Sequence, residues 1–311
     1  MKKFVFLAAI MLAALPALAA ETLKIGLLQI EDSVPFYVAE QEKFYARENL
    51  QVELIPFLSA LERDSALAAG AIDGAIDDPV GAILFDKGQG RLKITSLCLG
   101  ETAAEGVFAI LAAPQSGIQT VEELKNVEIA VSNSTIIEYV TDRMLEKRGF
   151  KAAEIKKIDV KQMPIRMQML LSDSVKAATL PEPLASIAAG KGARVLLTDA
   201  ESDESLSQTI IVFRATVLAA RKAEIAGFFR AYASAVSAIN GTPEKYRPLF
   251  VEKGRIPPHL AKTFPLPTYP MPAPFSASLY NPVIDWLAAK QLVAKLPYET
   301  MVATDFMNGH N

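Results

Sequence analysis

Short apolar runs alternate with helical segments along most of this chain, and this alternation restricts the possible folds more than any other feature. The runs show no helical stripe and have the length of buried strands. They cover residues 23–30, 52–57, 74–76, 92–99, 106–112, 127–131, 175–180, 195–198 and 208–213. Strands that are apolar on both faces and separated by helices are typical of a parallel sheet covered by helices. The sequence therefore predicts an α/β fold.

Capping signals mark several of the helices between these runs. Ser59 with Glu62, and Thr135 with Glu138, form capping boxes, and Pro35 suits the first turn of a helix. The predicted helices cover residues 35–47, 60–70 and 223–240, segments opening at 77–79 and at 135, and residues 276–290. The proline-rich stretch 257–274 cannot form one regular element.

The strand and helix series falls into two sets with extended chain between them. The chain is longer than a single hydrophobic core usually needs, and its length suits two cores. We expect it to cross from one lobe to the other near residues 101–106 and to return near 205–214. The predicted architecture is two doubly wound α/β lobes joined by two crossing strands, with a ligand cleft between them. Lobe I would comprise residues 21–104 and 207–311, and lobe II residues 105–206; one large sheet is the alternative.

The first 20 residues have the pattern of a signal peptide. Lys2 and Lys3 precede an apolar run over residues 4–15, and small residues follow at 17–19. The run is too short for the membrane anchor that is the alternative, since crossing a bilayer takes ~20 apolar residues. We expect cleavage near Ala19 or Ala20 and a periplasmic mature chain. No cysteine stands directly after the cleavage site, so lipid attachment there has no acceptor thiol.

Composition excludes several other classes of protein. The 32 basic and 35 acidic side chains are interleaved, which argues against a nucleic-acid surface or a membrane-binding patch. Cys98 is the single cysteine, so no internal disulfide can form. No phosphate-binding loop, zinc-ligand spacing or serine nucleophile motif is present. We therefore expect no cofactor, no metal and no catalytic residues.

Five segments, in family order, resemble the periplasmic substrate-binding proteins of ABC importers. They resemble the branch that includes sulfonate, taurine, nitrate and thiamine-precursor binders. The segments are Pro35–Glu40 with Phe44 and Val52–Leu54, Ser65–Leu67 with Gly70–Ala75, Val121–Lys125 before Glu128–Val131, Leu180–Pro183, and Val283–Leu287. The resemblance implies the type II periplasmic-binding-protein fold, with lobes that close on a ligand like a hinge. It also implies a monomer whose partners are a small-molecule ligand and the membrane permease and ATPase of an importer.

Candidate ligand residues follow from the rule that ligands bind beyond the carboxyl ends of strands in open α/β sheets. They are Gln29, Glu31, Asp32, Phe36, Ser59, Asp77, Asp78, Glu101, Asn133, Ser134, Thr135 and Glu182. Each has a plainer interpretation. Ser59, Thr135 and either aspartate could act only as helix caps, and Phe36 could belong to the core. Met163 and Met167 lie on one helical face and could form a ligand wall, although core packing is the expected role.

The charges at these strand ends indicate a class of ligand. Six of the candidates are acidic, and we count no lysine or arginine at the same strand ends. We therefore expect a cationic, zwitterionic or N–H-rich heterocyclic metabolite rather than a sulfonate or nitrate. Two other functions remain as alternatives: a sensor that presents its solute to a membrane receptor, and an enzyme of the thiamine-pyrimidine or menaquinone-precursor type.

Overall fold

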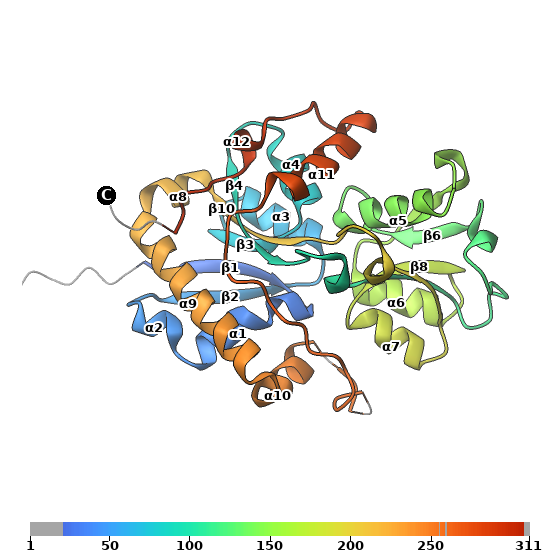
Figure 1. The fold of residues 1–311 in the computed structure, drawn as a ribbon, viewed down its shortest axis with the longest axis horizontal. Coiled ribbons are helices and arrows are strands. Elements are labelled where there is room, and N and C mark those ends of the chain that lie inside the picture. Colours follow the sequence, from blue (N-terminus) through green and yellow to red (C-terminus); the bar gives the residue numbers. More distant parts are fainter. Residues whose placement is uncertain (1–20, 255, 259, 308–311) are drawn as a thin grey trace, which may run out of the picture.

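Two five-stranded sheets, each covered by helices, build this protein (Figure 1). The computed structural model describes residues 21–254, 256–258 and 260–307. The predicted signal peptide, with its cleavage site at Ala19 or Ala20, lies outside the described residues. We call the halves built on the two sheets lobe I and lobe II. The prediction of two α/β lobes, rather than one large sheet, is confirmed.

Lobe I contains the first four strands of the chain and the last one. Its sheet has the order β2-β1-β3-β10-β4. The strands are β1 (Leu23–Leu28), β2 (Val52–Phe57), β3 (Gly74–Asp77), β4 (Leu92–Leu99) and β10 (Thr209–Arg214). β1 pairs in parallel with β2, from Leu23 opposite Val52 to Leu28 opposite Phe57.

Helices cover both faces of the lobe I sheet (Figure 1). One layer consists of α1 (Val34–Gln41), α2 (Phe44–Arg47), α9 (Lys222–Gly241) and α10 (Pro243–Lys253). The other contains α3 (Ala60–Ala68), α4 (Pro79–Asp86) and α11 (Ala277–Ala289), and two short helices, α8 (Ala215–Ala220) and α12 (Tyr298–Met301), complete the lobe. The single helix predicted over 35–47 is interrupted because Lys43 adopts a left-handed conformation, with φ 60°.

Lobe II has a sheet of the same size, with the order β7-β6-β8-β5-β9. Its strands are β5 (Phe108–Ala112), β6 (Glu128–Val131), β7 (Lys156–Asp159), β8 (Ala177–Pro181) and β9 (Arg194–Thr198). One face carries α5 (Ile136–Lys147), and the other carries α6 (Met163–Leu171) and α7 (Leu184–Gly190) (Figure 1).

Each sheet contains one strand that runs against its neighbours, which corrects the expectation of parallel sheets. β10 is antiparallel to β3 and β4, and β5 is antiparallel to β8 and β9. Both strands follow a crossing from the other lobe. The chain therefore enters each sheet at the edge that faces the other lobe, where the parallel strands end, and must run away from it. β7 was not predicted, because its Lys-Lys-Ile-Asp sequence forms a polar edge strand without an apolar run.

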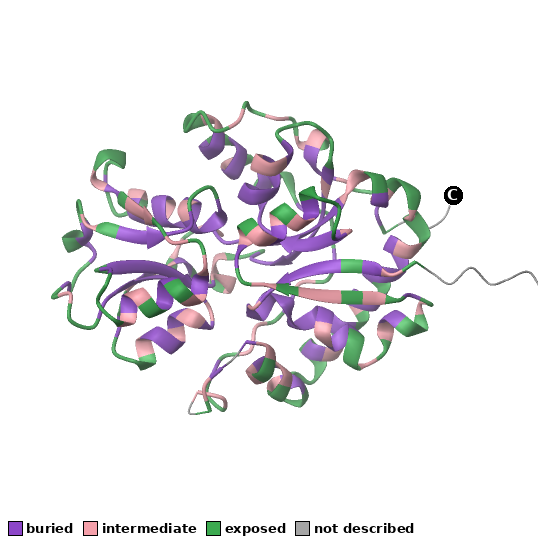
Figure 2. Cartoon of the chain, turned by 180° about the vertical axis from the view of Figure 1, so that it is seen from behind, coloured by how far each residue is buried: buried purple, intermediate pink, exposed green. Residues whose placement is uncertain are grey.

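The core of lobe I is centred on aromatic side chains between the sheet and α9. Phe36 lies there fully buried, with its ring centroid 5.0 Å from that of Tyr232 and 6.1 Å from that of Phe228. Phe36 is therefore packed in the core, which is the plainer of its two interpretations. Figure 2 shows the buried strands of both sheets between partly exposed helices. No helix in the described part of the chain is both long and apolar enough to cross a membrane.

Candidate functional site

A small pocket, which we call the strand-end pocket, lies where the ends of β1, β3, β6 and β8 meet between the lobes. Its volume is about 40 Å³. Lobe I contributes Leu28, Ile30, Ala60, Asp77, Asp78 and Thr209, and lobe II contributes Phe108, Ser132, Thr135, Ile136, Lys161, Met163 and Pro181. The predicted candidates Asp77, Asp78 and Thr135 are thus brought together from two lobes.

Asp77 lies at the end of β3 and is one of the residues that line the strand-end pocket. Its Oδ1 accepts hydrogen bonds from the Arg63 guanidinium and, at 2.7 Å, from the backbone N–H of Asp78. Its Oδ2 is buried and has no hydrogen-bond partner among the described residues. Burial raises the pKa of the Asp77 carboxyl well above its usual range, although Arg63 opposes the shift. One acceptor atom is therefore buried without a donor, an arrangement that proteins rarely tolerate.

Asp78 connects the two lobes. Its Oδ1 accepts from the N–H of Gly81 at 2.7 Å, which caps α4, and from the N–H of Ile136 at 3.2 Å, in the first turn of α5. The first contact lies within lobe I and the second reaches lobe II. Burial raises the pKa of this carboxyl to about 6. The free N–H groups and positive dipole of the α5 N-terminus are thus already matched with a carboxylate of the protein itself.

Thr135 and its neighbours begin α5. The Thr135 hydroxyl accepts from the N–H of Ile137 at 3.2 Å and donates to the carbonyl of Ser132 at 2.8 Å. Ser134 has a φ of 61° and donates its N–H to Glu138, while the N–H of Asn133 goes to Asp159. Thr135 both caps the helix and lines the pocket, whereas Asn133 and Ser134 do not line it.

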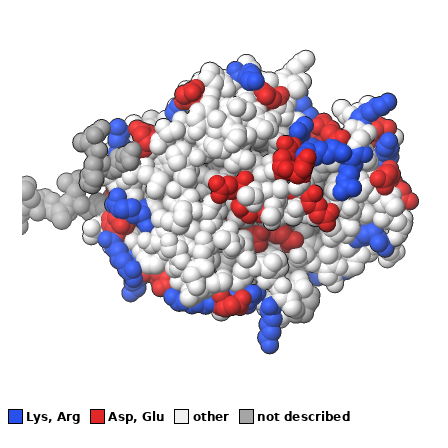
Figure 3. Space-filling view, in the orientation of Figure 1, with Lys and Arg blue, Asp and Glu red and all other residues white. Residues whose placement is uncertain are grey.

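A second, larger cavity lies beside the segments that cross between the lobes, and we call it the acidic cavity. Its volume is about 670 Å³, and Glu31, Glu101, Glu105 and Glu182 are among its lining residues. Burial raises the pKa of Glu31, and the nearby carboxylates of Asp32 and Glu182 raise it further. Glu182 accepts from the Ser186 hydroxyl at 2.9 Å, and burial raises its pKa as well. Figure 3 shows acidic side chains gathered near the middle of the molecule in this view, where the lobes meet.

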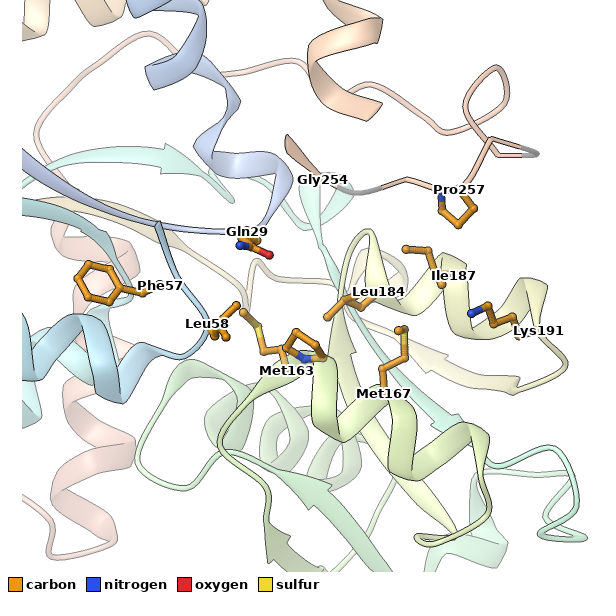
Figure 4. A pocket seen from close by; sticks show the side chains of 11 residues that line it. Gln29, Phe57, Leu58, Met163, Met167, Leu184, Ile187, Lys191, Gly254 and Pro257 are labelled. Atoms are coloured by element: carbon orange, nitrogen blue, oxygen red, sulfur yellow. The ribbon is translucent and has the colours of Figure 1, made fainter. Parts of the chain in front are cut away.

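A third cavity, which we call the methionine pocket, opens beside the strand-end pocket (Figure 4). Its volume is about 240 Å³. Gln29, Phe57 and Leu58 come from lobe I, Met163, Pro164, Met167, Leu184, Ile187 and Lys191 from lobe II, and Gly254 and Pro257 from the end of α10 and the following loop. The two methionines line this cavity and are also buried among the core residues, so core packing is confirmed and a ligand wall stays a prediction.

The remaining predicted residues have structural contacts. Ser59 caps α3 by accepting from the N–H of Glu62 at 3.2 Å. The Thr209 hydroxyl donates to Asp32 at 2.6 Å, and burial raises the pKa of Asp32 to about 6. Neither Ser59 nor Asp32 lines any of the three cavities described above.

Known proteins share both sequence and fold features with this chain. The profile of the NMT1/THI5-like family matches residues 31–246, well over half of the chain. The chain belongs to this family. No curated protein sequence matches it. The family and the fold together agree with the resemblance drawn from the sequence motifs.

Several solved structures are similar to this NMT1/THI5-like protein. One is the ligand-binding component of an ABC-type import system from Staphylococcus aureus, solved with zinc bound (TM-score 0.74, 16% identity, covering 92% of this chain and 98% of that chain). Another is the periplasmic aliphatic sulphonate-binding protein SsuA from Escherichia coli (TM-score 0.73, 18% identity, 92% and 99%). A variant of DszB in complex with biphenyl-2-sulfinic acid is also similar (TM-score 0.68, 12% identity, 92% and 97%). At these identities the likeness concerns the fold, and it confirms the predicted periplasmic-binding-protein architecture.

The count of charges at the strand ends needs a correction. Lys161 follows β7 and lines the strand-end pocket, and Arg63 lies buried behind Asp77. Lys161 was missed because β7 was missed. Arg63 was missed because it lies inside a helix, from which it reaches Asp77 and also binds Asp64 at 2.8 Å. Arg63 therefore pairs with two carboxylates, those of Asp64 and Asp77.

Among the described residues, no group of three or more histidine, cysteine, aspartate or glutamate side chains is placed to share a metal ion.

Proposed function

We propose that this protein is the extracytoplasmic solute-binding component of an ABC importer. It captures a small molecule between its lobes and delivers it to a membrane permease and its ATPase. Three observations support the proposal: the signal-peptide pattern of the N-terminus, membership of the NMT1/THI5-like family, and the two-lobed fold with cavities between the lobes. The similar import component from Staphylococcus aureus has the same fold over nearly its full length.

The proposed ligand carries an amine or N–H donors, as in an amino compound or a nitrogen heterocycle. The unpartnered Oδ2 atom of Asp77 is the observation that carries this proposal. A ligand N–H placed in the strand-end pocket would supply the missing donor, and a cationic ammonium would also favour the ionised carboxylate. Asp78 and Thr135 line the same pocket and offer further acceptor atoms.

The contact between Asp78 and the N-terminus of α5 favours the same class of ligand. This helix start is where an anionic ligand would gain most from free N–H groups. Asp78 already occupies it, and a sulfonate entering there would have to displace a carboxylate or lie against it. Repulsion between like charges in a buried site disfavours that arrangement.

Calorimetric titration of the chain from residue 21 onwards tests the proposal. The probes are ethylamine, 4-aminopyrimidine, amino acids and ethanesulfonate. We expect binding of the amine or heterocycle and weaker or no binding of the sulfonate. The Asp77→Asn variant should bind the same probe about 10- to 100-fold less tightly, since an amide NH₂ replaces one of the two acceptor oxygens in a buried site. Glu53→Gln, an exposed change on β2 that lines none of the three cavities, is the control and should bind like the wild type. Tight binding of ethanesulfonate alone would refute the proposed ligand class.

The same sample also separates binding from catalysis. A solute-binding protein returns its ligand unchanged, whereas an enzyme of the same fold converts it. Mass spectrometry of each bound probe after prolonged incubation should find its mass unaltered. Conversion of a probe at a rate that depends on protein concentration would favour an enzyme.

A further inference from the structure

The strand-end pocket is too small to hold a whole metabolite. Its volume of about 40 Å³ is only a few times the roughly 10–15 Å³ that a single water molecule needs by the same measure. It can take a single polar group, such as an ammonium or a ring N–H. The rest of any ligand anchored there must occupy neighbouring space between the lobes.

The lining residues show which neighbouring space is continuous with it. Met163 lines both the strand-end pocket and the methionine pocket. Two further segments contribute to both: Leu28 and Ile30 flank Gln29 at the end of β1, and Leu58 lies two residues before Ala60. The acidic cavity shares no lining residue with the strand-end pocket. A ligand held at Asp77 therefore extends past Met163.

The methionine pocket has an apolar lining. Leucine, isoleucine, methionine, proline and phenylalanine side chains form most of its wall, and Gln29 and Lys191 are its two polar members (Figure 4). Its volume of about 240 Å³ exceeds the roughly 150 Å³ of an apolar cavity that accepts benzene. The two methionines form a flexible, polarisable wall that adapts to apolar groups of different shape.

We infer that the ligand is amphiphilic, with a polar head at Asp77 and an apolar chain or ring of about four to eight carbons in the methionine pocket. This inference rests on the proposed function and narrows its ligand class. The pocket lies between the lobes, so an apolar group that enters it is buried against both. Filling it thus couples burial of apolar surface to closure of the lobes.

Two homologous series of probes test the inference by calorimetry: n-alkylamines and n-alkanesulfonates with two to eight carbons. Within the series that binds, affinity should rise about 4-fold per methylene, because each buried methylene contributes a nearly constant free energy. The rise should level off once the pocket is full. Because the two series differ only in the head group, they test the head group and the apolar chain separately. A preference for sulfonates would refute the proposed head-group chemistry and would leave the inference about the apolar pocket standing.

Leu58→Ser is the diagnostic variant, and Leu61→Ser is its matched control. Both leucines are exposed on lobe I, at 39% and 48%, but Leu58 lines the methionine pocket and Leu61 does not. We expect Leu58→Ser to weaken binding of the six-carbon probe about 3- to 10-fold and to leave the two-carbon probe unchanged. Leu61→Ser should behave like the wild type with both. Affinity that is independent of chain length in the binding series overturns the inference, as does failure of both six-carbon probes to bind at millimolar concentration.

Discussion

Burial, more than ion pairing, determines the ionisation of the carboxyl groups around the cleft. Asp32 and Asp78 each have a pKa raised to about 6, and that of Glu31 is raised well above its usual range. In each case removal from water is the largest cause, because a low-dielectric environment disfavours the charged form. At neutral pH Asp32 and Asp78 therefore hold their charge at a cost in stability, which ligand N–H donors in the cleft would reduce.

For Asp32, the effect of this burial on the free energy of unfolding can be measured as a function of pH. Its pKa rises from 3.8 to about 6 on folding. Below about pH 4 it is protonated in both the folded and the unfolded chain. Between about pH 4 and pH 6 the unfolded chain loses the proton first, so the free energy of unfolding falls by up to ~3 kcal/mol. Asp32→Asn should therefore match the wild type near pH 4 and exceed it in stability by up to about 3 kcal/mol at pH 7.5, measured by urea unfolding.

Asp203 is a control for this prediction, because folding lowers its pKa whereas folding raises that of Asp32. Its ion pair with Lys147 lowers its pKa, so the stability it contributes is present at neutral pH and is lost as the pH falls through the folded pKa. Asp203→Asn should be slightly less stable than the wild type at neutral pH, and the difference should shrink in acid. A stability difference for Asp32→Asn that does not vary between pH 4 and pH 7.5 would contradict burial as the cause.

Among the elements, α5 contacts lobe I at three successive positions in its first two turns. Asp78 binds its first turn. Further along, the Tyr139 ring lies 5.3 Å from Trp286 of α11, at an interplanar angle of 84°. One turn later, Lys290 of α11 pairs with Asp142. Closure of the lobes therefore brings three separate groups of lobe I onto one helix of lobe II.

Lys290→Met tests whether the α11 contact stabilises the closed state. The change removes an ion pair between the lobes and keeps the length of the side chain. We expect a larger radius of gyration by small-angle X-ray scattering and roughly 3- to 10-fold weaker ligand binding, because Asp142 is nearly buried. Lys157 also pairs with Asp142, at 2.8 Å, and this limits the loss.

Lys295→Met provides the matched control for this prediction. Lys295 pairs at 2.6 Å with Asp285, also on lobe I, and both side chains are exposed. Its removal should change neither the radius of gyration nor the affinity. Equal effects of the two substitutions would show that the contact between α11 and α5 does not govern closure.

At the scale of the whole molecule, the two segments that join the lobes lie against each other. The chain crosses from β4 to β5 through residues 100–107 and returns from β9 to β10 through residues 199–208. The Ser205 hydroxyl donates to the carbonyl of Gly100 at 2.7 Å, and the Phe108 N–H donates to Asp199 at 2.8 Å. The two predicted crossing strands are instead irregular segments, each with one 3-10 turn, at Ala103–Glu105 and at Asp199–Glu201. Two such segments lying side by side form a hinge about which the lobes can open and close.

Gly100 is the tightest point of this hinge. Its φ is 91°, and a Cβ there would overlap the carbonyl group of Ser207, approaching its carbon to 2.9 Å. Gly100→Ala should therefore combine backbone strain with a clash and cost more than about 3 kcal/mol in the free energy of unfolding. Gly117 has a similar φ of 79° with nothing within 4 Å, so Gly117→Ala should cost only ~1–2 kcal/mol. Comparable losses for the two variants would show that the crossing segments are loosely packed.

The sequence by itself determined the local elements and the order in which they occur. Apolar runs without a helical stripe identified most strands, and capping residues such as Ser59 and Thr135 identified helix starts, because both signals depend on neighbours in the chain. The strand-end rule also selected Asp77, Asp78 and Glu182, because each directly follows or ends an apolar run. The polar strand β7 was missed because it has no such local signal.

Only the tertiary structure decided how these groups meet. The pairing of Arg63 with Asp77, the contact of Asp78 with α5 and the burial of Phe36 all join residues that are distant in the chain or depend on the direction of a side chain. The reversed direction of β5 and β10 follows from where the chain enters each sheet. Six acidic candidate positions were readable from the sequence. Which of them keeps an acceptor atom free for a ligand depends on packing between two lobes, and no periodicity in the chain records that packing.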